Sequence, residues 1–271
     1  QVANVDSADL LFAHWRALVE RIRAAFAADP ELAGVVITHG TNTLEETAWL
    51  LQLLIDDPRP VVLVGAMRPA TALSADGPLN LLQAVQVASS PEARGQGVLV
   101  VMDGQIHAAQ RVTKLATQGV GAFASPGGGP LGWVDDVGVH LPTASGSRHV
   151  PFAGLDLPEQ WPQVPIVYGC VEPEPLLLSA CLNAGVAGLV FTGTGDGYVH
   201  GFHVYPAEDE ARVQAGASFS RKARRPSRPS GEARRSAMTP GRDWTCSLSG
   251  LPPFHSVRIR LPEWWMPISG P

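Results

Sequence analysis

Residues 35–48 read Val35-Val-Ile-Thr-His-Gly-Thr-Asn-Thr-Leu-Glu-Glu-Thr-Ala48, and this stretch decides the fold that the sequence predicts. Its β-branched beginning is typical of a short buried strand ending at Thr38, and the glycine that follows permits a tight turn. Thr43 and Glu46 have the spacing of a capping box, so a helix is expected over residues 44–55. A strand that turns directly into a helix begins a β-α-β unit.

The same alternation of apolar runs and helical periodicity continues on both sides of this stretch. Helices are expected over residues 9–28 and 78–88, and strands over residues 61–64 and 98–102. A β-α-β-α-β order indicates a parallel sheet covered by helices on both faces. We therefore predict an α/β protein that begins with a parallel, flavodoxin-like sheet domain.

A second, smaller α/β domain is expected after a region of weak pattern. Residues 125–163 carry turn residues and little periodicity, after which strands are expected at 165–168 and 188–191 around a helix at 175–184. The predicted boundaries are residues 1–142 for the first domain, 143–162 for a linker, and 163–271 for a Rossmann-like second domain.

Composition excludes several classes of protein. The 271 residues carry a net charge of −5 and are 45% hydrophobic, enough for a sizeable core and without bulk attraction to nucleic acid. No apolar run is long enough to span a membrane. The three cysteines are an odd number without CxxC spacing, so neither a disulfide framework nor a zinc site is expected. The first residues show no signal peptide.

The end of the chain changes character. Residues 221–242 hold eight basic side chains, opposed only by Glu232, among frequent Ser and Pro. A disordered, solvated tail is the favoured interpretation. Binding to nucleic acid or to an anionic membrane is a second one, weakened by the lack of interleaved aromatic residues. A third is that residues from about 216 onward are read out of frame, because the composition changes abruptly inside an expected domain.

Three loops that follow expected strands could carry chemistry, since ligands bind beyond the carboxyl ends of parallel strands. Thr41 and Asn42 lie at a helix N-terminus, which suits a carboxylate, although turn and capping roles fit them equally well. The backbone carbonyl of Ala66 could accept from a ligand amide, or belong to an ordinary polar loop closed by a cap at Asp76. Lys114 could act as a base, although a lone lysine is more often a surface charge.

Several motifs, taken together in their order, resemble the asparaginase/glutaminase family in its bacterial type II-like branch. The resemblance covers residues 1 to about 200. The motifs that carry it are His39-Gly-Thr-Asn-Thr-Leu-Glu-Glu-Thr-Ala48, Gly65-Ala-Met-Arg-Pro69, Ser74-Ala-Asp-Gly-Pro78, Val112-Thr-Lys114, Ala122-Phe-Ala-Ser-Pro126, Gly129-Pro-Leu-Gly132 and Asn4-Val-Asp-Ser7.

The resemblance implies an amidohydrolase that converts L-asparagine to L-aspartate and ammonia through a threonine acyl-enzyme, without metal or cofactor. It implies that Thr41 is a catalytic threonine and that Lys114 hydrogen-bonds it. Ser7 would bind the α-carboxylate of the substrate, and the Ala66 carbonyl its scissile amide. Asp196 falls where the family has an asparagine contributed across a subunit interface. Homo-oligomers, some glutaminase activity and a cytoplasmic location are further expectations, with a periplasmic location if an upstream signal was lost.

Three departures from the family pattern oppose a fully active site. Asn42 stands where the family has an aspartate that pairs with the substrate ammonium, so a weakened enzyme, a changed substrate preference or no activity is expected. The Thr-Gly-Gly-Thr-Ile-Ala motif, which holds the family's first catalytic threonine, does not occur in the sequence. We therefore expect an N-terminally incomplete chain. The third departure is that the C-terminal end does not match the family, so an aberrant C-terminal segment is also expected. The alternative function is a catalytically inactive relative or fragment that at most binds aspartate or asparagine.

Overall fold

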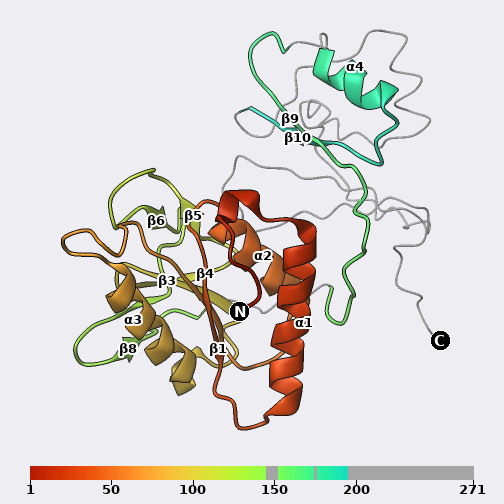
Figure 1. Cartoon of the computed structure of the whole chain (residues 1–271). Coiled ribbons are helices and arrows are strands. Elements are labelled where there is room, and N and C mark those ends of the chain that lie inside the picture. The colour runs from red at the N-terminus through yellow and green to blue at the C-terminus, as the bar shows by residue number, and fades with distance from the viewer. Residues whose placement is uncertain (145–151, 174–175, 195–271) are drawn as a thin grey trace, which may run out of the picture. The chain divides into compact units, whose positions relative to one another are not determined.

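The computed structural model describes residues 1–144, 152–173 and 176–194 (Figure 1). The chain divides into two compact units, Gln1–Glu159 and Gln160–Pro271. Asp196, the basic stretch at 221–242 and the segment from 216 onward lie outside the described residues. Within those residues no helix is both long and apolar enough to cross a membrane.

The first unit alternates helices and strands much as the sequence predicts. Its helices are α1 (Phe12–Ala28), α2 (Leu44–Leu54), α3 (Gly77–Ser89) and the short 3-10 helices η1 (Ser7–Asp9) and η2 (Pro91–Ala93). Its strands are β1 (Val35–Thr38), β2 (Val61–Val64), β3 (Val98–Met102), β4 (Gln105–Ala108), β5 (Thr113–Lys114), β6 (Phe123–Ala124), β7 (Gly132–Val134) and β8 (Val139–His140).

The main sheet is mixed, so the prediction of a parallel sheet is only half right. Its strand order is β1-β2-β3-β4-β7-β8; β1 to β3 are parallel, and each later neighbour is antiparallel. The direction reverses at Asp103 and Gly104, which join β3 to β4 with φ angles of 50° and 71°. A two-residue Asp-Gly connection with both φ angles positive is a type I′ turn, which produces a hairpin rather than a crossover. The strands β7 and β8 also form in a region where the sequence shows little pattern.

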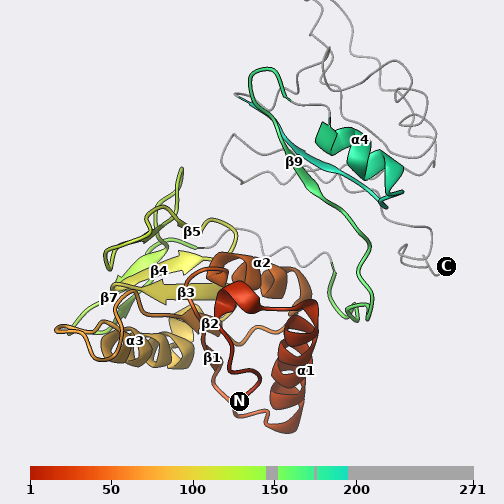
Figure 2. The same ribbon diagram turned by 45° about the horizontal axis from the view of Figure 1, so that its top comes forward.

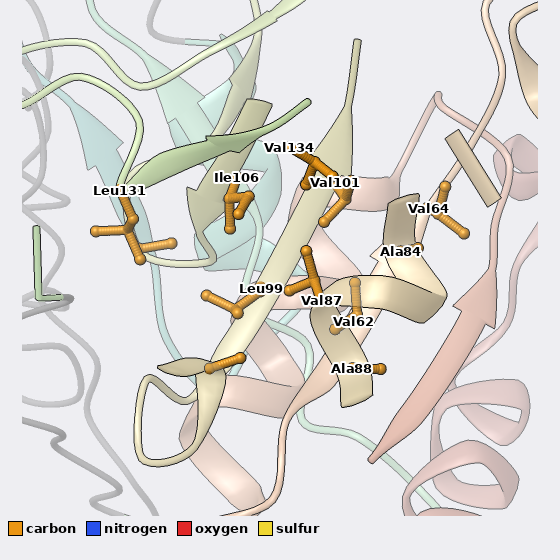
Figure 3. Packing of buried hydrophobic residues seen from close by; sticks show 12 residues of the cluster. Val62, Val64, Ala84, Val87, Ala88, Leu99, Val101, Ile106, Leu131 and Val134 are labelled. Carbon is orange, nitrogen blue, oxygen red and sulfur yellow. The ribbon is translucent and has the colours of Figure 1, made fainter. Parts of the chain in front are cut away.

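Helices cover both faces of this sheet, as predicted (Figure 2). Figure 3 shows α3 packing through Ala84 and Val87 onto Val62, Leu99 and other side chains of one face. The alternate residues of β2 and β3 are equally buried on the opposite face, on the side of α2. Because β1, β2 and β3 lie side by side while α2 and α3 lie on opposite faces, the two β-α-β crossovers have opposite hands. Right-handed crossovers are the strong norm, so one of the two is an exception to it.

Helix α1 lies beside α2 and buries one stripe of side chains. Val19, Ile22 and Phe26 are buried at spacings of three and four residues, the periodicity of an amphipathic helix. The guanidinium of Arg59 lies 4.1 Å from the centre of the Phe26 ring and donates to two backbone carbonyls at the end of α1, those of Phe26 and Asp29. These contacts fasten the end of α1 to the segment that leads into β2.

The described part of the second unit is a small α/β layer. Strands β9 (Ile166–Tyr168) and β10 (Val190–Thr192) are parallel, and α4 (Leu176–Asn183) connects them. Leu178 of α4 and Leu189 form its small buried core. All three elements agree with the sequence prediction within a few residues.

Candidate active site

The candidate site lies at the carboxyl ends of the adjacent parallel strands β1 and β2, which end in register at Thr38 and Val64. Two loops follow these strands, and we name them the first loop (residues 39–43) and the second loop (residues 65–76). A groove of about 790 Å³ reaches this edge and is lined by β1, α1, residues 1–5, and Gly40 and Ala66 of the loops. The parallel arrangement thus brings together segments that the sequence separates.

Thr41 and Lys114 are in direct contact. The Nζ atom of Lys114 donates a hydrogen bond of 2.8 Å to Thr41 Oγ1. The backbone N–H of Lys114 also donates to the carboxylate of Glu45, in the first turn of α2. The first loop contacts Lys114 through Thr41 and the start of α2 contacts it through Glu45, although β5 is distant in sequence.

Ser7 and Asp6 approach the first loop from η1. Ser7 is buried, and its Oγ accepts from the backbone N–H of Asn42 at 3.1 Å, while its carbonyl accepts from Thr43 Oγ1 at 2.7 Å. The Nδ2 amide of Asn42 donates to Asp6 Oδ1 at 3.1 Å, and the same oxygen accepts from Ala8 N–H at 2.8 Å. The Ala8 N–H, then the Asn42 amide, lower the pKa of Asp6.

The second loop is shaped by the carboxylate of Asp76. Its two oxygens accept from the backbone N–H groups of Met67 and Arg68, each at 2.9 Å. Asn80 donates to Asp76 at 3.1 Å and to the Gly65 carbonyl at 3.0 Å. Burial acts to raise the pKa of Asp76, but the hydrogen bonds outweigh it and the pKa is lowered. These bonds fix the backbone on both sides of Ala66.

The two loops touch at Gly65. A Cβ at that position would lie 2.9 Å from the His39 carbonyl oxygen and 3.0 Å from Thr41 Cγ2, closer than side chains normally approach. Gly40 has a similar constraint, since a Cβ there would lie 2.6 Å from Ser7 Oγ. Glycine at these positions lets the first loop lie against both the second loop and η1.

His39 links the first loop to the helices beneath it. Its Nε2 lies 2.9 Å from Thr47 Oγ1, and this hydroxyl oxygen accepts from the indole N–H of Trp15 at 2.9 Å. Its Nδ1 lies 2.7 Å from the Gly40 carbonyl oxygen. A neutral ring with its proton on Nδ1 satisfies both contacts. Burial lowers the pKa of His39 against the opposing effect of the Gly40 carbonyl, which agrees with a neutral ring.

The structure thus places Thr41, Asn42, Ser7, Ala66 and Lys114 at one edge of the sheet, and their catalytic and binding roles stay predictions. Asp196 lies outside the described residues.

Two capping predictions are wrong in detail. Thr43 is the N-cap of α2 but makes no side-chain cap bond, because its hydroxyl donates to Ser7 instead. Asp76 precedes α3 without a side-chain cap bond there, because its carboxylate turns into the second loop.

Three residues that contact the site, Asp6, Glu45 and Asn80, are not among those that the sequence predicts. Only Asn80 had a local signal, because it lies four residues after Asp76 at the start of a helix. The partners of Asp6 and Glu45 in the site are 36 and 69 residues away in the sequence, which no local pattern reveals.

Comparisons with known proteins place this geometry in a family. The N-terminal asparaginase domain matches residues 1–145. A probable periplasmic L-asparaginase of Haemophilus influenzae is 40% identical over 215 residues, which cover 78% of this chain and 60% of the relative. A glutaminase-asparaginase of Pseudomonas fluorescens is 41% identical over 193 residues, which cover 70% and 53%.

A solved structure shows the same fold. It is the probable cytoplasmic L-asparaginase of Campylobacter jejuni, with a TM-score of 0.70 and 37% identity over 79% of this chain and 67% of that one. The chain spans between half and two thirds of the length of the curated relatives named above. The domain match covers more than half of the 271 residues, and the chain belongs to the asparaginase family.

Proposed function

We propose that this chain carries an amidohydrolase site that converts L-asparagine to L-aspartate and ammonia through a threonine acyl-enzyme. The observation that carries the proposal is the 2.8 Å hydrogen bond from Lys114 Nζ to Thr41 Oγ1 beyond the carboxyl ends of β1 and β2. A hydroxyl and an amine within hydrogen-bond reach form the pair that transfers protons in acyl transfer. The L-asparaginase names of the relatives support the same reaction.

The proposed reaction has two steps. A threonine hydroxyl attacks the side-chain amide carbonyl, the carbon–nitrogen bond breaks, and ammonia leaves with the proton from the hydroxyl. Water then hydrolyses the ester and releases aspartate. The amine of Lys114 would accept and return the proton through Thr41. Ser7 would donate to the substrate carboxylate, and the Ala66 carbonyl would accept from the amide N–H.

A second candidate function is binding of aspartate or asparagine without hydrolysis. One observation favours it: Asn42 has no charge, whereas the family resemblance puts an aspartate at this position. In this candidate function Ser7 and Ala66 contact the ligand, and Thr41 and Lys114 do not catalyse its hydrolysis.

Ammonia release and equilibrium binding separate the two candidates. We would measure both for the 271-residue chain and for a version extended by any in-frame upstream coding sequence. Ammonia release from L-asparagine by either version supports the hydrolase. Binding of L-aspartate by both versions without ammonia release supports the second candidate. Neither binding nor turnover would contradict both.

The second substrate, the oligomeric state, the cellular location and the domain arrangement are also proposals. The glutaminase-asparaginase name of one relative supports L-glutamine as a second substrate. We further propose a homo-oligomer in the cytoplasm, with the periplasm as the alternative because the relatives' names include both compartments. The flavodoxin-like and Rossmann-like arrangement, with boundaries at residues 142 and 163, stays a prediction. Binding of nucleic acid is not expected.

A further inference from the structure

A histidine that the proposed reaction does not use is buried in the first unit. His107 lies on β4 with 1% of its surface exposed, and its Nδ1 lies 2.9 Å from Ser125 Oγ. Its Nε2 has no hydrogen-bond partner in the part of the chain that the structure describes. Burial lowers the pKa of His107 to about 4, so the ring is neutral at neutral pH and its bond to Ser125 joins two uncharged groups.

Ser125 connects this histidine to the strand pair that carries Lys114. It directly follows β6, which pairs with β5 in a two-stranded ribbon separate from the main sheet, and Phe123 is the cross-strand partner of Lys114. Because side chains alternate along a strand and paired residues share a face, Lys114, Phe123 and Ser125 project from the same face of the ribbon. Phe123 and Ser125 are buried, whereas Ala124 between them is only half-buried, which agrees with this alternation.

The ribbon is too short to fix its own position. Each of its strands has two residues, and even a longer isolated two-stranded hairpin is only marginally stable. Strand β4 is already paired on both sides, with β3 and β7, so the ribbon cannot join it through a backbone ladder. The bond between His107 and Ser125 attaches the ribbon to β4 through side chains instead.

A polar pair at this place is better explained by alignment than by stability. Two buried, uncharged partners can be replaced by apolar side chains of similar shape at little cost, and the unpaired Nε2 of His107 itself costs free energy. The pair adds direction, because a hydrogen bond fixes the distance and angle between two atoms. Apolar packing is not directional in this way.

We propose that His107 is a positioning residue for Lys114, which it aligns with Thr41 by holding Ser125 and the β5–β6 ribbon against β4. This assignment rests on the proposed function, because His107 acts on the reaction only through the Lys114–Thr41 pair. It should therefore affect the catalytic step more than substrate binding, since the proposed binding groups, Ser7 and the Ala66 carbonyl, lie on η1 and the second loop.

The main test is the double variant His107→Leu with Ser125→Ala, which replaces both polar groups by apolar ones. Its unfolding free energy should stay close to that of the unaltered chain. In the version of the chain that releases ammonia, kcat for L-asparagine should fall about ten- to a hundred-fold with KM within a few-fold, because a displacement of about 1 Å can cost about a hundred-fold in rate. In the full 271-residue chain, the amides of residues 113–115 and 122–124 should exchange their hydrogens faster.

Three single variants make the test specific. His107→Asn places its amide close to the position of Nδ1, can still bond Ser125, and should retain most of kcat. His107→Gln places its amide close to the position of Nε2 and should show the loss. Ile106→Val trims the neighbouring side chain on the opposite face of β4, away from the ribbon, and should leave kcat within a few-fold.

The remaining outcomes contradict the assignment or the proposed function separately. An unchanged kcat, or unchanged exchange in the ribbon, for the double variant would overturn the assignment. Equal kcat in His107→Asn and His107→Gln, or a loss in Ile106→Val as large as in the double variant, would show that only general packing matters and would overturn it too. If no version of the chain releases ammonia, the proposed function fails, and hydrogen exchange alone decides whether His107 holds the ribbon.

Discussion

The two loops of the candidate site lie side by side but are held in different ways. The first loop depends on hydrogen bonds between residues 35 to 73 positions apart, which connect it to Ser7 and Lys114. The second loop depends mainly on bonds between residues 4 to 15 positions apart, centred on Asp76 and Asn80, although Gly65 N–H also donates to Met102 Sδ, 37 positions away. Most bonds of the second loop are therefore local, whereas the first loop takes its shape only when η1, α2 and β5 have assembled around it. Changes far away in the sequence should affect the first loop most.

The largest effect is expected at the hydroxyl of Thr41. Thr41→Val removes the acceptor of Lys114 Nζ and should lower turnover of L-asparagine by about two to four orders of magnitude, the usual range for a lost proton-transfer group. Thr43→Val is the matched control in the same loop, because its hydroxyl contacts only the Ser7 carbonyl. It should lower the free energy of unfolding by about 1 kcal/mol and leave turnover within a few-fold. Equal losses of turnover would show that the loop, and not the Thr41 hydroxyl, matters.

Asp76 offers the corresponding test of the second loop. Asp76→Asn leaves one acceptor oxygen for two backbone N–H groups, those of Met67 and Arg68. The free energy of unfolding should fall by about 1.5–3 kcal/mol, the range for a hydrogen bond to a charged group. Urea titration would measure it, with Asp9→Asn as a control carboxylate at the surface. An unchanged unfolding free energy would show that the loop holds its shape without Asp76.

A smaller effect is expected where α2 holds the backbone of Lys114. Glu45→Ala removes that contact and should lower turnover about tenfold, because the backbone of Lys114 loses its attachment to α2. The amide of Lys114 should also exchange its hydrogen faster. Glu46→Ala is the control, an exposed neighbour on the same helical turn. Glu45→Gln retains an acceptor and should recover most of the turnover. Equal effects of the Glu45 and Glu46 alanine variants would contradict the claim that Glu45 positions the backbone of Lys114.

The two loops should also lose stability in different ranges of pH. Burial lowers the pKa of His39 below its ordinary value of 6.5, so the unfolded chain binds the proton first. The contribution of His39 is fully present above pH 6.5 and is lost as the pH falls below it. The lowered pKa of Asp76 means that its contribution is present above its ordinary value of 3.8 and is lost as the pH falls through the depressed value.

Urea titrations across this range of pH would separate the two contributions. His39→Gln should reduce the loss of unfolding free energy between about pH 7 and pH 5, and Asp76→Asn should reduce the loss below about pH 4. Identical pH profiles for both variants and the unaltered chain would contradict the assignment of these windows to the two loops.

The sequence predicts the parts of this molecule that depend on local pattern. Apolar periodicity is enough for α1, α2, α3 and the first three strands, and β-α-β order is enough to put Thr41 and Ala66 at one edge. The reversal of direction after β3 could also have been predicted, because Asp103-Gly104 between apolar runs is a strong hairpin signal. The regular alternation of helices and strands before it favoured a parallel sheet instead.

The contacts of Asp6 and Glu45 could not be predicted in the same way. They depend on which side chains meet after η1, α2 and β5 have packed, and neither residue belongs to a pattern with its partner. The first loop is therefore the region where a structure adds most to the sequence.

The most direct test of the account is ammonia release from L-asparagine by the chain and by its Lys114→Met variant, each measured alone and with any in-frame upstream coding sequence restored. Methionine keeps the length of the side chain and removes the amine that contacts Thr41. We predict turnover that falls by at least about a hundred-fold in Lys114→Met, with the unfolding free energy nearly unchanged. Turnover that is equal in the two proteins, or absent from all of them, would contradict the claim that Thr41 and Lys114 form an amidohydrolase site.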